Sequence, residues 1–486
     1  MGSAASQLAS TATSLLLIPV VLATLGSAVY GAWIVLSTLM VLASLADLGV
    51  RSEVMRRTAA AIGSGRQDSI ESIIGQGLSA IGISLLIVVT PLLILSPHVV
   101  RLAVPSSVVG GSRSTLTGLF VVLLITLSVN VLLTVPFSAM RGMQRGYVED
   151  AIRVVSTVCS MGLTISVLLW SQSLWALAVG QVANTAGLAA GITLALRSHL
   201  GPGARLRVGR LTWAQFGGWM TLSGLLLMSQ LADVIDSQWD KIVLSRVVGL
   251  GAVTALHIGT TMVLALRAIA LVPIVPLIAS TAELRLSNPQ LGDDVFRACR
   301  TAVHLLGFSL LATIALTAES VLGLWLPDGY GRAGDVAALF SVAMGVNLCT
   351  AALSMRAIGE GKHRLIAASA ATNVVVNAIS SLWLALNIGL LGVVWGSVIG
   401  NACGVAVMHL GYRRLDNGPR WPFPFRSIAA ALVLTFVVRS LVDSTAMASL
   451  RLLSVSVGHL VVVGGAISLL NWRDTEHLVR TIKATR

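Results

Sequence analysis

The sequence predicts an all-α polytopic membrane protein of about fourteen transmembrane helices, with two pseudo-symmetric six-helix lobes around a central cleft and two extra C-terminal helices. Three observations predict this class: the apolar composition, the number of long apolar runs, and the one-sided distribution of Lys and Arg. Of the 486 residues, 55% are hydrophobic and only 11% are charged, whereas a soluble domain is about 25% charged. A soluble core cannot hide so much apolar surface, so the bilayer is the expected solvent.

Apolar runs near twenty residues long are each expected to form a transmembrane helix, because an unpaired backbone group is costly in lipid. The runs lie at residues 5–25, 31–50, 71–95, 115–138, 150–170, 173–196, 214–237, 251–279, 302–326, 335–355, 365–386, 389–411, 427–443 and 452–470. They leave no long extramembrane domain, so any function is expected to lie within the helical bundle.

Lys and Arg are distributed unevenly between the two sets of loops that these runs define. Twenty-five of the 33 lie on one side and seven on the other, while Arg267 lies inside a span. Because positively charged short loops stay in the cytoplasm, we expect a multi-pass cell-membrane protein with both termini cytoplasmic. The formal net charge of +13 is then an orientation signal, and no nucleic-acid partner is expected.

Short motifs recur in the same order in the two halves of the chain, at offsets of 215–223 residues. The matching pairs are Met140–Gly146 with Met355–Gly361, Ala178–Gly187 with Val394–Gly404, and Gly26 with Gly249. Chance matches between glycine-rich spans are the alternative, but the shared order favours a duplicated six-helix lobe. Since six is even, both lobes start on the cytoplasmic side as parallel repeats, a geometry that leaves a central cleft.

The duplication sets the predicted domain boundaries. They are an N-terminal lobe at residues 1–197, a cytoplasmic linker at 198–213, a C-terminal lobe at 214–414, and spans 13 and 14 with a cytoplasmic tail at 415–486. The C-terminal pair of spans has no counterpart in the first lobe and is therefore expected to be an addition to the repeated unit.

The motifs of common enzymes are missing from the sequence. There is no phosphate-binding loop and no His-Glu-x-x-His, and the stretch Gly361-Lys362-His363 lacks the upstream glycine and the hydroxyl that a phosphate loop needs. The cysteines have no metal-ligand spacing and are expected to be buried small hydrophobes; they are Cys159, Cys299, Cys349 and Cys403. We expect no catalytic residues, no metal site and no cofactor, and hence no enzyme.

Arg267 is the sharpest candidate for a binding residue, because an ionisable group inside a span is costly and is usually functional or paired. It lies in the apolar run Thr260–Ala279, roughly 24 Å from the outer start of its span. A guanidinium there suits a phosphate or pyrophosphate, since its fork binds two oxygens of an oxyanion. The alternatives are an ion pair with an acid of the bundle and snorkelling to the inner surface.

Three acidic residues follow one helical face at the end of the seventh span. Asp233, Asp236 and Asp240 recur at i, i+3 and i+7, and Lys241 follows them. One interpretation is a cation or proton site near the outer mouth of the cleft. The other is an outer gate in which the acids pair with Lys241 or Arg246.

The first span carries a polar stripe on an otherwise apolar helix, formed by Gln7, Ser10, Thr11 and Ser14. Amides and hydroxyls of this kind suit contacts with a sugar. They also suit hydrogen bonds that hold helices together in lipid, and the sequence leaves both interpretations open.

The second span ends in Asp47 and a burst of arginines, Arg51, Arg56 and Arg57. The arginines are first of all an orientation signal. We expect Asp47 to pair with this cluster at the inner mouth of the cleft, as part of a gate, with proton coupling as a second interpretation.

The segment Leu25–Arg57 resembles the start of Wzx-type flippases, the polysaccharide transporters of the multidrug/oligosaccharidyl-lipid/polysaccharide (MOP) exporter superfamily. The residues that carry the resemblance are Leu25, Gly26, Tyr30, Gly31, Trp33, Asp47, Leu48 and Gly49. Trp239–Val253 resembles the family's segment entering span 8, and Met355–Arg364 resembles its loop after span 10.

The resemblance implies a flippase that moves a polyprenyl-pyrophosphate-linked oligosaccharide from the inner to the outer leaflet by alternating access. Its partners would be this lipid-linked substrate and the membrane lipids, with a coupling ion (H⁺ or Na⁺) and a polysaccharide polymerase complex as further candidates. The family's cavities are typically cationic, which fits Arg267. The alternatives are a lipid II flippase and a drug or metabolite–cation antiporter of the same superfamily. Deeply placed acids in both lobes would favour the antiporter.

Overall fold

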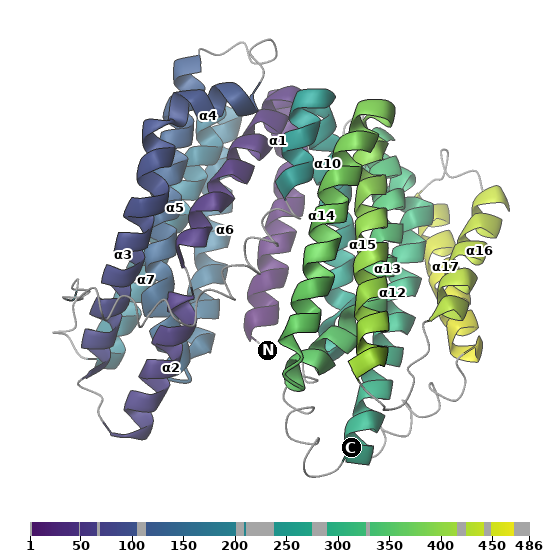
Figure 1. The fold of residues 1–486 in the computed structure, drawn as a ribbon. Helices are drawn as coiled ribbons and strands as arrows, with labels where there is room; N and C mark the ends of the chain where they lie inside the picture. Colours follow the sequence, from purple (N-terminus) through teal and green to yellow (C-terminus); the bar gives the residue numbers. More distant parts are fainter. Residues whose placement is uncertain are drawn as a thin grey trace. The chain divides into compact units, whose positions relative to one another are not determined.

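The computed structural model describes residues 2–47, 49–65, 69–104, 113–200, 209, 238–274, 289–326, 331–415, 424–441 and 449–470. The regular elements within these ranges are all helices (Figure 1). Contacts divide the chain into unit 1, which is Met1–Val234 with Gly249–Gly251, and unit 2, which is Ile235–Val248 with Ala252–Arg486. This division does not test the predicted domain boundaries at 197, 213 and 414, which therefore stay predictions.

Unit 1 contains eight described helices in chain order. They are α1 (Gly2–Ser44), the 3₁₀ helix η1 (Leu45–Asp47), α2 (Val50–Gly63), α3 (Ile70–Ile94), α4 (Ser96–Ala103), α5 (Arg113–Gly142), α6 (Gly146–Ser171) and α7 (Trp175–Leu200). Its buried core is apolar, and Phe120, Phe137 and Leu123 are among its fully enclosed side chains.

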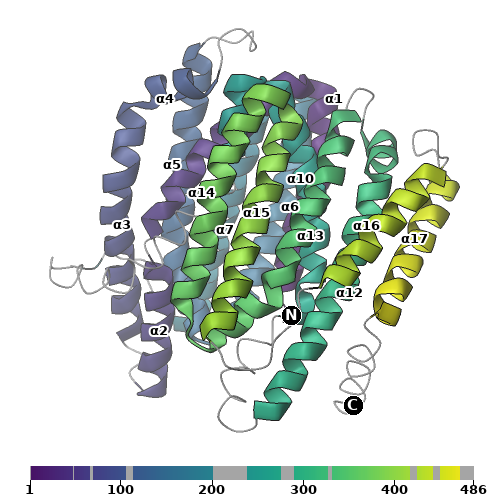
Figure 2. The same cartoon turned by 45° about the vertical axis from the view of Figure 1, so that its right-hand side comes forward.

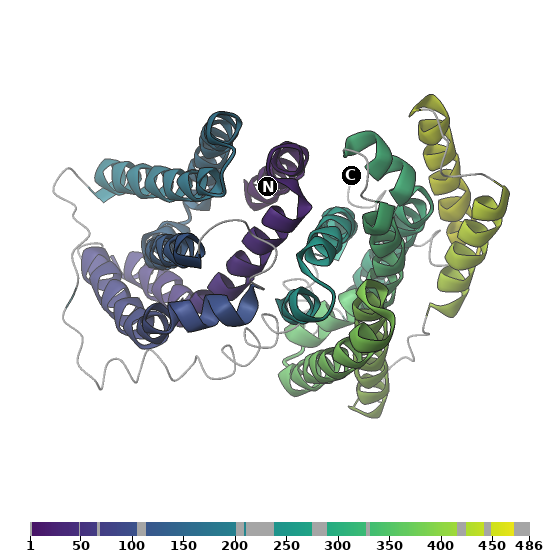
Figure 3. The same ribbon diagram turned by 90° about the horizontal axis from the view of Figure 1, so that it is seen from above.

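Unit 2 begins, in its described part, with a helical stretch at residues 238–247. The helices that follow are α10 (Leu250–Ala270), the 3₁₀ helix η3 (Val272–Ile274), α12 (Pro289–Trp325), α13 (Gly331–Gly359), α14 (His363–Ile388), α15 (Leu390–Leu415), α16 (Phe425–Leu441) and α17 (Ser449–Leu470). Figures 2 and 3 show α16 and α17 beside α12, in agreement with their contacts.

The predicted all-α membrane architecture is confirmed. Within the described residues, ten helices are long and apolar enough to cross a membrane, and two shorter apolar segments lie in α16 and α17. The kinked α1 holds the first two predicted runs, so thirteen of the fourteen runs fall on described helices. The remaining run, 214–237, lies outside the described residues.

The turn between the first two spans is shorter than predicted. The predicted runs end at residue 25 and resume at residue 31, whereas the helix α1 is interrupted only at Gly26, where φ is +76° and ψ is 168°. The two halves of α1 diverge from this point like an inverted V (Figure 1). Gly249, the residue matched to Gly26 by the predicted duplication, also has a positive φ, +117°, directly before α10. Both positions favour glycine because it has no Cβ to clash.

Two helix elements differ from the predicted boundaries. The eighth predicted run extends to residue 279, but α10 ends at Ala270 and is followed by a 3₁₀ turn that contains Pro273, since proline cannot continue the hydrogen-bond ladder. In contrast, α12 begins at Pro289, well before the predicted start at 302. Part of the polar stretch expected to be a cytoplasmic loop is therefore a helical extension.

Glycines make the same helix–helix contact in both units. In unit 1, Gly180 of α7 lies against Thr164 of α6, where an added Cβ would clash with the Thr164 hydroxyl. In unit 2, a Cβ on Gly396 of α15 would lie 2.6 Å from the Cα of Ser381 on α14. The two contacts are related by offsets of 216 and 217 residues, which supports duplication with a shared close-packed seam.

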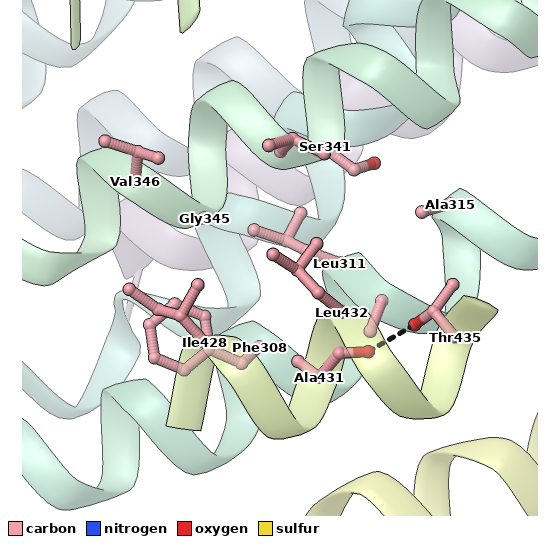
Figure 4. Close-up of a pocket in the computed structure, with 12 residues that line it drawn as sticks. Phe308, Leu311, Ala315, Ser341, Gly345, Val346, Ile428, Ala431, Leu432 and Thr435 are labelled. Atoms are coloured by element: carbon pink, nitrogen blue, oxygen red, sulfur yellow. Dashed lines mark hydrogen bonds between the residues drawn. The ribbon is translucent and has the colours of Figure 1, made fainter. Parts of the chain in front are cut away.

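The helix α16 packs against α12 and α13 around a small apolar cavity of about 70 Å³ (Figure 4). Phe308, Leu311, Ile428 and Leu432 are among its lining residues. The cavity lies beside the contact that fixes α17: the buried ring of His459 lies 3.1 Å from the Thr313 hydroxyl of α12 and 3.3 Å from the Thr435 hydroxyl of α16. This histidine thus joins three helices.

Candidate binding cavity

A polar cavity of about 360 Å³ lies inside unit 2. Its walls come from residues 238–241 and from α10, α13, α14 and α15. The polar lining residues are Gln238, Asp240, Lys241, His257, Thr260, Thr261, Arg267, Asn347, Asn377, Ser397 and Asn401. Polar groups at this density are unusual between apolar spans, so this cavity is a candidate site.

The cavity brings together three of the predicted site residues, Arg267, Asp240 and Lys241. Two are cations and one is an acid, so the ionised cavity carries an excess of positive charge. The Lys241 ammonium donates a 3.0 Å hydrogen bond to Oε1 of Gln238. Such a lining suits an anionic group better than a cation.

Arg267 projects from the last turn of α10. Its Nη2 donates a 2.8 Å hydrogen bond to Oδ1 of Asn347 on α13. This partner is a neutral amide within unit 2, and the binding role of Arg267 stays a prediction beside the alternatives of an ion pair and snorkelling. The carbonyl groups at a helix C-terminus also favour a nearby cation.

A chain of hydrogen bonds leads from Arg267 across the cavity wall to Asp240. Nδ2 of Asn347 donates to Oδ1 of Asn401 at 2.8 Å, and Nδ2 of Asn401 donates to the carbonyl oxygen of Ser397 at 2.8 Å. The Ser397 hydroxyl then donates to Oδ2 of the buried Asp240 at 3.1 Å. Arg267 and Asp240 are therefore linked through the side chains of Asn347 and Asn401 and through the carbonyl and hydroxyl groups of Ser397.

The sequence interpretation missed the amides of this chain, Asn347 and Asn401, and their neighbours Asn377 and Ser397. A signal was present: Asn347 and Asn401 are each the only amide side chain of their apolar span, where a polar group needs a partner on another helix. Asn377 accepts a 2.8 Å hydrogen bond from Ser381 one turn further along α14. Pairs of this kind are visible in sequence, but their interhelical partners are not.

Other predicted residues lie elsewhere. Asp233 and Asp236 lie outside the described residues, as do the side chains of Gln7, Ser10 and Thr11. Ser14 is exposed on α1 of unit 1. The role of the first-span stripe therefore stays a prediction.

Asp47 pairs with one arginine of the predicted cluster, Arg51. Arg51 Nε lies 3.4 Å from Oδ2 of Asp47. Arg56 and Arg57 instead bind Glu53, at 2.6 and 2.7 Å from its Oε1. The hydrogen bond from Arg56 and that from Arg57 hold the pKa of the Glu53 carboxyl below its usual value, against the opposing effect of burial. Spacing of i+3 and i+4 on α2 explains why Glu53 captures both.

In each unit, a glutamate whose side chain is only 6% exposed contacts basic groups near the Met-Arg motif. In unit 1, Glu149 accepts hydrogen bonds from Arg141 at 2.5 Å and Arg153 at 2.8 Å. In unit 2, Glu360 contacts Arg356 and Lys362, each at 2.7 Å. Each glutamate pairs with one arginine four residues away, Arg153 or Arg356, and with a second cation from across a turn, Arg141 or Lys362.

Within the described part of the chain, no group of three or more His, Cys, Asp or Glu side chains is placed to hold a metal ion. The four cysteines are free, and only Cys349 is buried, while Cys159 is exposed. The expectation that all four are buried is therefore wrong: an exposed position on an apolar span faces lipid, which suits a small thiol as well as a core does.

Comparison with known proteins places the fold. The model of a polysaccharide biosynthesis protein family matches residues 112–333. A structure of the lipid II flippase MurJ in an inward closed conformation matches with a TM-score of 0.76 at 11% identity, covering 97% of this chain and 99% of that chain. An inward-facing multidrug resistance MATE transporter of the MOP superfamily matches with a TM-score of 0.61 at 16% identity, covering 85% and 94%.

No curated protein sequence matches the chain. The matched family and structures nevertheless agree with the resemblance that the sequence motifs indicated. The two matched structures are those of a flippase and a transporter.

Proposed function

Because the chain is a multi-pass membrane protein with the fold of MurJ and the MATE transporters of the MOP superfamily, we propose that it is a lipid-linked oligosaccharide flippase. It moves a polyprenyl-pyrophosphate-linked oligosaccharide from the inner to the outer leaflet by alternating access. The observation that carries this proposal is the cationic cavity of unit 2, where Arg267 and Lys241 outnumber Asp240. The family match to a polysaccharide biosynthesis protein supports the glycan part of the substrate.

In this mechanism Arg267 binds the pyrophosphate. A guanidinium keeps its charge at any physiological pH and presents paired donors to phosphate oxygens. The amides and hydroxyls of the cavity, such as Asn377 and Thr260, offer hydrogen bonds to the first sugars. The lipid tail stays in the bilayer, because withdrawing it would cost about 0.8 kcal/mol per CH₂ group.

The remaining predicted residues have secondary roles in the proposal. Ser14, with Gln7, Ser10 and Thr11, adds polar contacts for the glycan. Asp47 with Arg51, and Asp240 with Lys241, Asp233 and Asp236, serve as gates or as sites for a coupling ion, H⁺ or Na⁺.

The protein is proposed to work in the cell membrane with both termini in the cytoplasm, on the strength of its Lys and Arg distribution. The predicted lobes at 1–197 and 214–414 would be the parts that alternate. A polysaccharide polymerase complex is a natural partner, since it would consume the flipped product.

One observation favours a second candidate, a cation antiporter of the same superfamily: the buried carboxylate of Asp240 lines the same cavity. The likeness to MurJ supports a third, in which lipid II itself is the substrate. Cells lacking the protein would distinguish the three, because they would accumulate a lipid-linked oligosaccharide, retain a drug, or lose peptidoglycan synthesis respectively.

The direct test is a flipping assay in proteoliposomes with a fluorescent polyprenyl-pyrophosphate oligosaccharide. Arg267→Ala is expected to reduce flipping at least tenfold, because loss of a charge-assisted contact costs about 1.5–3 kcal/mol. Arg267→Lys should retain part of the activity, since it keeps the charge but not the fork. Normal flipping by the alanine variant would refute the role of Arg267.

A further inference from the structure

The hydrogen-bond chain in the cavity wall of unit 2 has a counterpart in unit 1. Comparing the two shows what the chain of unit 2 adds. In unit 1, Nδ2 of Asn130 on α5 donates to the Thr185 hydroxyl of α7 at 2.5 Å, and that hydroxyl donates to the carbonyl oxygen of Gln181. In unit 2, Asn347, Asn401 and Ser397 make the same sequence of contacts between α13 and α15. The corresponding residues are related by offsets of 216 or 217.

Both units thus use one amide bridge to hold equivalent helices together. Asn130 and Asn347 are both half-buried, and their partners Thr185 and Asn401 are both buried. The bridge by itself is therefore explained by helix packing in lipid, where interhelical hydrogen bonds are favourable. What unit 2 adds is the bond from the guanidinium of Arg267 to the other end of Asn347.

The guanidinium of Arg267 determines which group donates and which accepts in the amide bridge of unit 2. Arginine is a donor only, so Asn347 must turn its oxygen toward Arg267 and its NH₂ group toward Asn401. Asn401 must then present its own oxygen to Asn347 and its NH₂ group to the Ser397 carbonyl. Each amide has its two ends engaged, which fixes its rotamer and leaves little freedom for the arginine that it holds.

We propose that Asn347 is a positioning residue that fixes the Arg267 guanidinium in the cavity, with Asn401 as its support, so that the remaining N–H donors meet a phosphate or pyrophosphate group. This inference rests on the proposed function and names the residues that give the site its preference for a phosphorylated ligand. A neutral amide suits this task, because it orients the guanidinium without neutralising it as a carboxylate would. Preorganised donors bind an anion more tightly because no ordering cost remains to be met on binding.

The test measures the Kd of inorganic pyrophosphate by titration calorimetry on the full-length protein in nanodiscs. Asn347→Leu removes the hydrogen bond to Nη2 of Arg267. Asn347→Asp keeps the size and the acceptor oxygen but adds a negative charge that competes with pyrophosphate for the guanidinium. Both are expected to raise the Kd about tenfold. Asn130→Leu is the matched control: it breaks the equivalent bridge in unit 1 and should leave the Kd unchanged, with a similar loss of thermal stability.

A merely structural role is separated by the double variant Arg267→Ala with Asn347→Leu. If Asn347 acts through Arg267, the double variant binds pyrophosphate no more weakly than Arg267→Ala alone. Wild-type Kd values for both Asn347 variants, equal weakening by Asn130→Leu, or a further loss in the double variant would each overturn the inference.

Failure of the proposed function has a different signature. In that case the wild type would not bind pyrophosphate, or Arg267→Ala would bind it like the wild type. The link between Asn347 and Arg267 is then decided by thermal unfolding without ligand: losses in Tm that are less than additive support the bond, and additive losses refute it.

Discussion

The Tyr412 hydroxyl of α15 donates a 2.6 Å hydrogen bond to Oε2 of Glu360, which directly follows the end of α13. The same carboxylate contacts Arg356 and Lys362, and Arg356 lies 2.7 Å from Asp293 of α12. The Glu360 side chain is only 6% exposed, so its charge depends on these partners. Glu360 therefore joins α13 to α15 at one end of unit 2, and its partner Arg356 extends the connection to α12.

Replacing Glu360 by Gln should lower the free energy of unfolding by about 1–3 kcal/mol at neutral pH, because charged hydrogen bonds are lost in a buried place. Burial raises the pKa of the Glu360 carboxyl, but the hydrogen bonds from Lys362, Tyr412 and Arg356 outweigh it, so the net pKa is lowered. A lowered native pKa stabilises the protein above the unfolded pKa, and this contribution is lost as pH falls through the native value.

The difference in Tm between the wild type and Glu360→Gln is therefore expected to be largest near pH 7 and to shrink at acid pH. Thermal unfolding in detergent from pH 7 down to about pH 2 measures it, because the contribution is lost only below the unfolded pKa of about 4.3. A difference that stays constant over this range would contradict the assigned pKa direction.

Adding a methyl group at Gly396 should destabilise unit 2. The new Cβ would lie 2.6 Å from the Cα of Ser381, so α14 and α15 would have to separate, at a cost of about 1–3 kcal/mol. Gly162→Ala is the control, because a Cβ at that position of α6 meets nothing within 4 Å. It should be neutral or slightly stabilising, since Ala is the better helix former. Equal Tm values for the two variants would exclude the close seam.

Gly26→Ala should destabilise the first helical hairpin by about 1–2 kcal/mol, because an L-residue is strained at φ +76°. No atom lies within 4 Å of a Cβ at this position, so the penalty would come from the backbone alone. With ψ at 168°, Gly26 lies outside the left-handed helical region that Asn tolerates, so Gly26→Asn should lose as much Tm as Gly26→Ala. A larger loss for Asn than for Ala would point to crowding instead.

His459→Leu should cost only about 1 kcal/mol, although the ring contacts Thr313 and Thr435. Each of these hydroxyls also donates to a carbonyl of its own helix, at 2.8 and 2.6 Å, so neither loses its only partner. The Tm of the variant measures the effect. A loss several times larger would mean that the histidine carries more of the attachment of α17 than its hydrogen bonds indicate.

The helices were predictable because apolar run length is set by the bilayer, and residues 71–95 match α3 within a residue. Arg267 was predictable as an isolated charge in its span and Asp240 as one of three acids on a helical face, but their connection was not. It depends on Asn347 and Asn401, whose helices are brought together by tertiary packing. The single-residue turn at Gly26 was also missed, because polar and small residues after it, such as Ser27, continue the helix.

The turn at Gly26 also affects how the protein can be labelled. Gly26 is a one-residue turn with helix on both sides. An epitope or a reporter for mapping topology would interrupt a helix if it were inserted there. The short connection at Gln172–Leu174, between α6 and α7, leaves more room, since Gln172 already departs from the helix with φ of +45° and its neighbours form a bend and a turn. Tags placed there, rather than at the first hairpin, should report which side of the membrane the chain faces without breaking a span.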